Sequence, residues 1–164
     1  MRWLRAVNSR LSRWAMYIAC ACLSGLLAVV VYGVVLRYVF NNAPPYVEQV
    51  ALLLVISVAM FGAAAGVRDA GHIGLDSLVV VLPERVQFWC SIAVFVLGAV
   101  FGLTLLVGSV EMALSTHGST IPTLGISEAY RYLPVLAGGL LIAAFSIEHL
   151  IAKLAGTEVV RSWH

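Results

Sequence analysis

Four long apolar segments dominate this sequence and limit what it can fold into. They occupy residues 15–36, 49–67, 86–110 and 132–147, and none of them contains an Asp, Glu, Lys, Arg or His. A helix needs about 20 apolar residues to cross the hydrocarbon core of a bilayer. Only helices and closed barrels satisfy the backbone in lipid, and these segments lack the alternating pattern of barrel strands. The sequence therefore predicts an all-α integral membrane protein with four transmembrane helices.

The composition agrees with a single membrane domain covering residues 1–164. Hydrophobic residues make up 62% of the chain and charged residues only 11%, whereas charged residues are about a quarter of a soluble domain. The net charge of +2 is small, and no basic run with interleaved aromatic residues predicts nucleic-acid binding. We expect the spans to cover about residues 15–40, 46–68, 84–115 and 128–155.

Basic residues are distributed unevenly between the two sides of this domain. Eight fall at the N-terminus, in the connection between the second and third spans or at the C-terminus, and two fall in the other connections. Basic residues accumulate on the cytoplasmic side of membrane proteins, so we expect both termini in the cytoplasm. The eight are Arg2, Arg5, Arg10, Arg13, Arg68, Arg85, Lys153 and Arg161, and the two are Arg37 and Arg131.

Two amphipathic segments are predicted to lie along the membrane surface. In residues 1–14, apolar side chains recur at helical spacing opposite three arginines, which indicates a short interfacial helix; a disordered basic tail is the alternative. Residues 72–82 carry a similar apolar face, with Asp76 and Ser77 toward water. The apolar run that follows residue 14 is longer than that of a typical secretory signal and lacks a clear cleavage site, so we expect it to be a retained transmembrane helix.

The stretch RYVFNNAPPYVEQV, residues 37–50, places two opposite charges on either side of a short turn. Pro44 and Pro45 prevent the first helix from continuing. Arg37 and Glu48 therefore belong to the outer ends of neighbouring helices, where we expect them to close the hairpin or to contact a partner subunit. The alternative is that Arg37 extends to lipid headgroups while Glu48 is solvated at a helix N-terminus.

Small residues four positions apart indicate helix faces that can pack closely. The sequence GAAAG runs from Gly62 to Gly66, and GAVFG runs from Gly98 to Gly102. Small residues of this spacing allow helix backbones to approach one another in lipid. We therefore predict a helix or subunit contact at both pairs. Ser127 is a further local prediction, as the N-cap of the fourth span.

No residue pattern predicts catalysis, a metal site or a cofactor. No nucleophile lies beside a base at a recognisable spacing, and the three cysteines lack redox or metal-binding spacing and are interpreted as packing residues. Haem requires histidines inside the bundle, and only His149 lies near a span, so a redox-enzyme membrane anchor is a minor alternative.

Transport by this chain alone is also disfavoured. Ion-coupled carriers usually need an ionisable site or broken helices near the membrane midplane. The main alternative function is a small homo-oligomeric carrier or channel lined by hydroxyl groups. Those hydroxyls, which helix packing explains more simply, belong to Ser57, Ser91, Thr104 and Ser109.

Two longer stretches resemble the small membrane subunit of tripartite ATP-independent periplasmic (TRAP) transporters, and the similarity covers residues 15–150. They are RYVFNNAPPYVEQVALLLVISVAMFGAAAGVRDAGHIGLDSL and STIPTLGISEAYRYLPVLAGGLL. The residues that match the family pattern, in order, are Arg37, Tyr38, Glu48, Gly62, Ala63, His72, Ile73 and Asp76. The chain departs from the pattern at Tyr46, where Trp is usual, at Gln49, where a second acidic residue is usual, and at Ser127, where Pro is frequent.

The resemblance implies an auxiliary subunit, not an enzyme, of a sodium-coupled organic-acid uptake transporter in the bacterial inner membrane. In that family a periplasmic solute-binding protein delivers the solute, and a large membrane subunit carries the solute and sodium sites. The small subunit packs on the large one as a scaffold, with phospholipid around it and no cofactor of its own. The predicted interface residues are Arg37, Glu48, Gly62, Gly66, His72, Asp76, Gly98 and Gly102.

Overall fold

The computed structural model describes residues 2–42, 44–69, 83–121 and 125–155. Its elements, in chain order, are α1 (Arg2–Tyr38), α2 (Pro45–Asp69), α4 (Glu84–Ser115), the short 3-10 helix η1 (Glu128–Tyr132) and α5 (Leu133–Leu154). Within these described residues, four helices are long and apolar enough to cross a membrane, with η1 leading directly into α5 in the fourth. The predicted all-α fold with four transmembrane helices is therefore confirmed.

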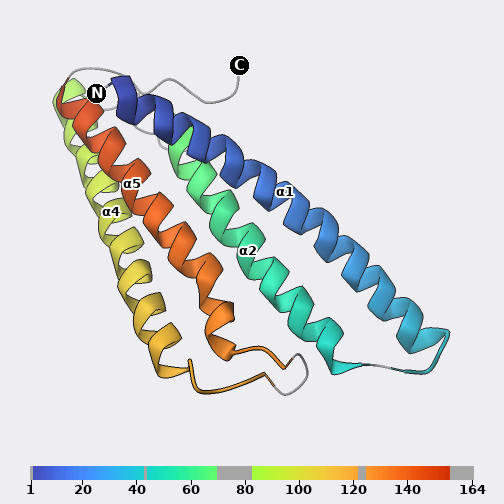
Figure 1. The fold of residues 1–164 in the computed structure, drawn as a ribbon. Coiled ribbons are helices and arrows are strands. Elements are labelled where there is room, and N and C mark those ends of the chain that lie inside the picture. The colour runs from blue at the N-terminus through green and yellow to red at the C-terminus, as the bar shows by residue number, and fades with distance from the viewer. Residues whose placement is uncertain (1, 43, 70–82, 122–124, 156–164) are drawn as a thin grey trace.

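The four long helices lie in a row, in the spatial order α1, α2, α5, α4 (Figure 1). Extensive contacts join α1 to α2, α2 to α5 and α5 to α4, whereas α1 touches α5 only slightly. The helices converge where α1 begins and α5 ends, which we call the terminal end, and spread apart toward the α1–α2 turn, which we call the hairpin end (Figure 1). A row, unlike a closed bundle, leaves two broad faces that the described helices do not cover.

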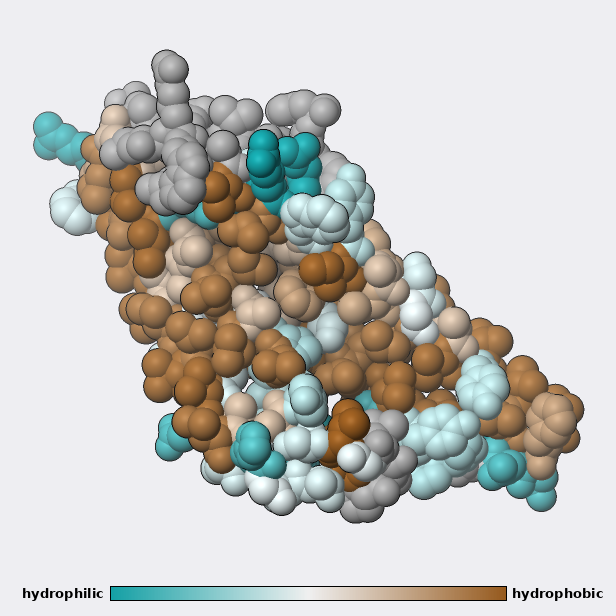
Figure 2. Space-filling view, in the orientation of Figure 1, coloured by the Kyte–Doolittle hydropathy of each residue, from teal (hydrophilic) through white to brown (hydrophobic). Residues whose placement is uncertain are grey.

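Burial is unequal along this row. In the fourth span, which contains α5, 39% of the residues of its most apolar stretch are buried within the chain. In the corresponding stretch of α1, only 6% of the residues are buried. The core contains Ala64 of α2 with Ile142 and Phe145 of α5, and Met60 and Leu105 pack against them. Most other large apolar side chains face outward and form the apolar surface between the two polar ends in Figure 2. A surface of this kind needs lipid or another protein to cover it.

The first helix differs from the prediction of a separate surface helix over residues 1–14. Residues 2–38 form one continuous helix, because no proline occurs before Pro44 to interrupt its hydrogen bonding. The 37 residues of α1 span about 55 Å at 1.5 Å per residue, far more than the roughly 30 Å hydrocarbon core. Even a strong tilt does not absorb this excess, so α1 extends beyond the core.

The connections at the hairpin end are ordered by local hydrogen bonds. Asn41 adopts a φ of 48°, in the left-handed region that Asn tolerates, and the Asn42 N–H donates to the Leu36 carbonyl at 3.0 Å. Before η1, the Ser127 hydroxyl accepts from the Ala129 N–H at 3.4 Å, which confirms the predicted N-cap, although it caps η1 rather than α5 itself. The surface helix predicted for residues 72–82 lies outside the described residues.

Candidate interface sites at the two ends of the row

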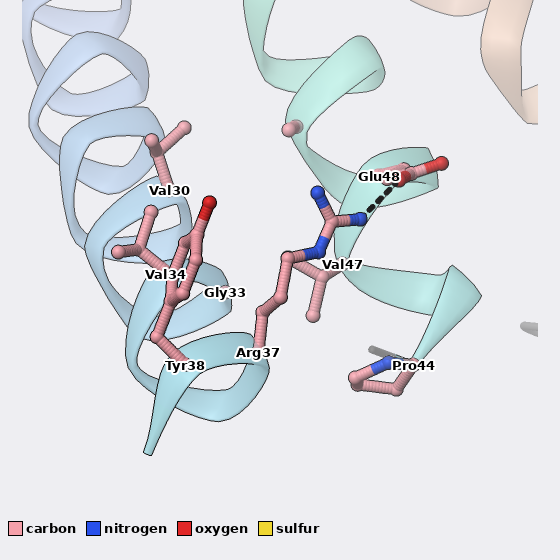
Figure 3. Close-up of a pocket in the computed structure, with 9 residues that line it drawn as sticks. Val30, Gly33, Val34, Arg37, Tyr38, Pro44, Val47 and Glu48 are labelled. Atoms are coloured by element: carbon pink, nitrogen blue, oxygen red, sulfur yellow. Dashed lines mark hydrogen bonds and ion pairs between the residues drawn. The ribbon is translucent and has the colours of Figure 1, made fainter. Parts of the chain in front are cut away.

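Arg37 and Glu48 face each other at the hairpin end (Figure 3). Arg37 lies in the last turn of α1 and Glu48 in the first turn of α2, and the Arg37 Nη2 is 3.5 Å from the Glu48 Oε1. Their side chains are 58% and 73% exposed. An exposed pair at this distance stabilises a protein by at most about 1 kcal/mol. The pair bridges the hairpin, but both groups keep most of their surface open to another molecule.

A shallow groove runs along the hairpin beside this pair (Figure 3). It has a volume of about 300 Å³, and its walls are largely apolar. Gly33 allows the two helices to approach here, because a Cβ atom at this position would lie 2.7 Å from the Val47 Cγ1. The remaining lining residues are Val30, Val34, Tyr38, Pro44 and Ala51.

Gln49, which replaces the second acidic residue of the family pattern, contacts Arg131. The Arg131 Nη2 donates to the Gln49 Oε1 at 2.6 Å, and the Arg131 Nη1 lies 3.4 Å from the Glu128 Oε1. The amide therefore links α2 to η1 as a neutral acceptor, and Glu128 supplies the countercharge for Arg131. A second carboxylate at position 49 is not needed for this contact.

The predicted glycine pairs lie in different surroundings. A Cβ on Gly98 would be 2.7 Å from the Ser146 Oγ, and one on Gly102 would be 2.5 Å from the Ala143 backbone nitrogen. These two glycines therefore allow α4 and α5 to pack closely within the chain. At Gly62 and Gly66 on α2, no atom of the described residues lies within 4 Å of an added Cβ. That pair is open to a partner, and its predicted role in a subunit interface stays a prediction.

The four hydroxyl groups of the alternative carrier or channel bond within their own helices, and two predicted interface residues lie outside the described part of the chain. The hydroxyls considered as pore-lining groups each donate to a carbonyl of their own helix, at 2.8 to 2.9 Å. They are Ser57, Ser91, Thr104 and Ser109. His72 and Asp76, by contrast, lie outside the described residues, so their predicted interface role stays a prediction as well.

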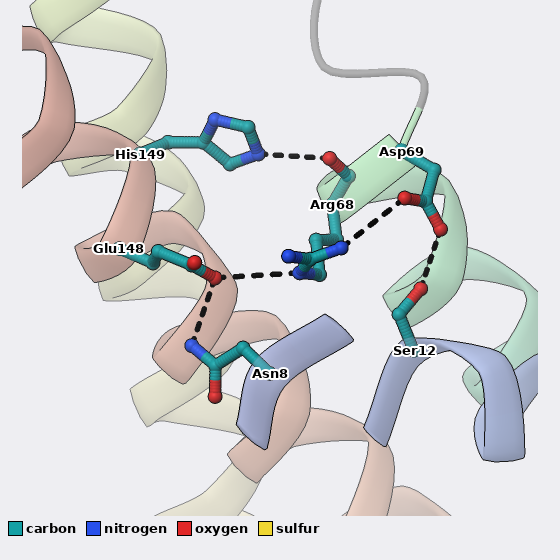
Figure 4. Close-up of polar contacts among 6 residues, drawn as sticks. All are labelled: Asn8, Ser12, Arg68, Asp69, Glu148 and His149. Carbon is teal, nitrogen blue, oxygen red and sulfur yellow. Dashed lines mark hydrogen bonds and ion pairs between the residues drawn. The ribbon is translucent and has the colours of Figure 1, made fainter. Parts of the chain in front are cut away.

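The terminal end contains a buried polar cluster that joins three helices (Figure 4). Its centre is the Glu148 carboxylate of α5, whose side chain is 6% exposed. The Glu148 Oε2 accepts from the Asn8 Nδ2 of α1 at 2.8 Å and from the Arg68 Nε of α2 at 3.4 Å. The Arg68 side chain is only 2% exposed. Within the described part of the chain, the Glu148 Oε1 is buried without a hydrogen-bond partner.

Further contacts extend the cluster on both sides. The Arg68 Nη1 donates to the Asp69 Oδ1 at 3.3 Å, and the Ser12 hydroxyl of α1 donates to the Asp69 Oδ2 at 2.5 Å. The His149 Nε2 lies 3.0 Å from the Arg68 carbonyl, which only accepts, so this nitrogen carries the hydrogen. The His149 ring stacks on Phe95 of α4 with centroids 5.1 Å apart. All four helices are thus linked at this end.

This cluster was not predicted from the sequence, because Arg68 was counted with the basic residues outside the spans and Glu148 was given no role. A signal was available. The predicted fourth span, residues 128–155, already contained Glu148, and an acidic residue inside a span normally faces the protein interior and pairs with a cation. Arg68, at the same end of the second span, was the natural candidate for that cation.

Comparison with known proteins gives one family. Residues 26–156 match the family described as Tripartite ATP-independent periplasmic transporters, DctQ component. Two Haemophilus influenzae proteins named as TRAP transporter small permease proteins are similar. One is 22% identical over 117 residues, which cover 71% of each chain. The other is 25% identical over 142 residues, covering 85% of this chain and 88% of the relative. The chain belongs to the DctQ family and is a small permease subunit of a TRAP transporter.

Proposed function

We propose that this subunit is the fixed scaffold of a sodium-coupled, binding-protein-dependent uptake transporter for organic acids in the bacterial inner membrane. In this role it packs on the large membrane subunit, which carries the solute and sodium sites. The subunit itself binds no cofactor and catalyses no reaction. Its contribution is to widen and anchor the frame against which the large subunit moves its solute.

The observation that carries this proposal is the row of helices with charged residues only near its two ends. The middle of each span lacks Asp, Glu, Lys, Arg and His, and α1, α2, α4 and α5 are continuous there. A carrier that works alone needs polar groups or broken helices at that depth. The hydroxyls that would replace them donate within their own helices. A row with two apolar faces suits a scaffold, which needs one face for lipid and one for its partner.

Two surfaces are proposed for the partners. The open Gly62–Gly66 strip of α2 is where the large subunit approaches, because its backbone accepts close contact with another helix. With both termini in the cytoplasm, the hairpin end faces the periplasm. The exposed Arg37 and Glu48 side chains then lie where the solute-binding protein docks, because they retain unsatisfied charged surface.

The test is affinity purification of the tagged subunit from native membranes in a mild detergent, with mass spectrometry of the proteins that co-purify. We expect a multi-span partner in equal amount. The variant Gly66→Leu should reduce the partner yield at least fivefold without lowering the amount of subunit in the membrane, because an added Cβ at Gly66 meets no atom of the described residues within 4 Å. The matched control is Gly108→Leu on α4, where an added Cβ likewise meets no described atom within 4 Å.

One result would contradict the scaffold proposal, and another would contradict only the surface proposed on α2. A homo-oligomer without a multi-span partner favours the small carrier or channel. Equal partner yield from Gly66→Leu and the wild-type subunit removes the α2 strip from the interface, while leaving the scaffold role to be carried by another face.

A further inference from the structure

We propose that the buried cluster at the terminal end is a clasp that determines the position of α1, by tying it to α5 across α2. The clasp consists of Asn8 on α1, Arg68 on α2 and Glu148 on α5, with Ser12 and Asp69 as a second link between α1 and α2. This inference concerns the subunit itself and does not depend on which partner or solute the transporter uses.

Packing alone holds α1 weakly. Its most apolar stretch is 6% buried, and among the described helices its only extensive contact is with α2. Lipid tails are as apolar as helix side chains, so no hydrophobic force presses α1 against its neighbours. Specific polar contacts therefore have a large share in deciding where α1 stays.

The polar contacts differ between the two ends of α1. At the hairpin end, Arg37 and Glu48 are more than half exposed, and the hydroxyls of Tyr32 and Tyr46, both exposed, lie 3.3 Å apart. Water and headgroups compete for such groups. At the terminal end, Ser12 is fully buried, and the side chains of Arg68 and Glu148 are 2% and 6% exposed. Hydrogen bonds to charged groups are stronger there, and their loss is more costly.

A single oxygen, the Glu148 Oε2, lies at the centre of the clasp. The Glu148 Oε2 receives both the α1 donor, Asn8, and the α2 donor, Arg68. Within the described residues, the Glu148 Oε1 has no donor that could take over when one of these is removed. A buried carboxylate that loses a donor is left under-solvated. The arrangement therefore makes the positions of α1 and α2 depend on each other through one atom of α5.

The clasp is tested by measuring helix distances with pairs of spin labels on the full chain in lipid nanodiscs. Cys20, Cys22 and Cys90 are free and are first replaced by Ala. One pair, Leu11→Cys with Leu154→Cys, reports α1 against α5 at the terminal end. A second pair, Val31→Cys with Leu52→Cys, reports α1 against α2 farther toward the hairpin end. All four labelled positions are exposed in the chain.

We expect Glu148→Ala and Asn8→Ala each to broaden the terminal-end distance distribution roughly twofold and to leave the second pair unchanged, because the clasp acts at one end only. Combining the two substitutions should add little to Glu148→Ala alone, since both remove the same contact. The matched control is Glu111→Ala, on an exposed acidic residue of α4, which should change neither pair. If Glu148→Ala prevents membrane insertion, Asn8→Ala carries the same test, because it leaves the Arg68–Glu148 contact in place.

Two outcomes would overturn the clasp. An unchanged terminal-end distribution in Asn8→Ala shows that the Asn8–Glu148 contact does not hold α1 against α5. Equal broadening of both label pairs shows a general loss of structure instead of the release of one end.

Discussion

Gly102→Ala is the substitution whose effect follows most directly from the geometry. A Cβ atom at this position would lie 2.5 Å from the Ala143 nitrogen, 2.8 Å from the Gly139 oxygen and 2.9 Å from the Ala143 Cα. All three are backbone atoms of α5, so no side-chain rotation relieves the clash. Ordinary contacts begin at about 3.5 Å, so α5 must move away by about 1 Å. Overpacking of this kind costs about 1–3 kcal/mol of unfolding free energy.

The magnitude is best measured against Gly108→Ala on the same helix. At Gly108 no atom of the part of the chain that the structure describes lies within 4 Å of an added Cβ. Both substitutions gain the same helix propensity, roughly 0.8–1 kcal/mol, so this term cancels in the comparison. The difference between the two variants then isolates the clash with α5. At about 3 °C for each kcal/mol in a chain of this size, the two melting temperatures should differ by roughly 3–9 °C.

The assay is thermal unfolding of the purified subunit in one detergent, followed by reaction of a fluorescent thiol reagent with the three native cysteines. Gly108→Ala should melt at or slightly above the wild-type temperature, and Gly102→Ala should melt below it. The reasoning is refuted if Gly102→Ala melts at the same temperature as Gly108→Ala. That result would mean that α4 and α5 separate without loss, and that the contact at Gly102 is not a close-packed seam.

Two further predictions concern the hairpin end. Replacing Arg37 or Glu48 by Ala should change the unfolding free energy by less than about 1 kcal/mol, because the pair is exposed and screened. Uptake assays should nevertheless show a marked loss of transport if these charges contact a partner. Full uptake in both variants contradicts that role. Ser127→Ala should lower the unfolding free energy by about 1 kcal/mol through loss of the N-cap of η1. Thermal unfolding checks this, with Ser119→Ala, at an exposed serine, as the control. Equal melting temperatures of the two variants would argue against the cap.

The membrane fold could be predicted from sequence because lipid imposes a simple rule. A segment without charges must satisfy its backbone internally, and this rule identifies the four spans without knowledge of their partners. The closeness of Arg37 and Glu48 at the hairpin end could also be predicted from the sequence, because Pro44 and Pro45 fix a short turn between them. Ser127 was identified from its residue type and position alone.

The order of the helices could not be predicted in the same way, because it depends on contacts between distant residues. Gly62 and Gly98 begin identical five-residue spacings, yet an added Cβ would clash with α5 at Gly98 and would meet no described atom within 4 Å at Gly62. Arg68 and Arg85 are both basic residues at the ends of spans, yet Arg68 is buried and Arg85 is exposed. Which side of a helix faces a neighbour decides both cases, and a single sequence does not contain that information.

The two ends of the row differ in a way that bears on the proposed scaffold. Helices packed in a row expose more broad surface than the same helices in a closed bundle, because none of their faces turn toward a common centre. Such a row lacks the mutual packing that keeps a bundle together, so it needs other restraints. The buried clasp at the terminal end fixes the relative positions of α1, α2 and α5. Leaving exposed pairs at the hairpin end, where the helices spread (Figure 1), keeps that end available for contacts with a partner.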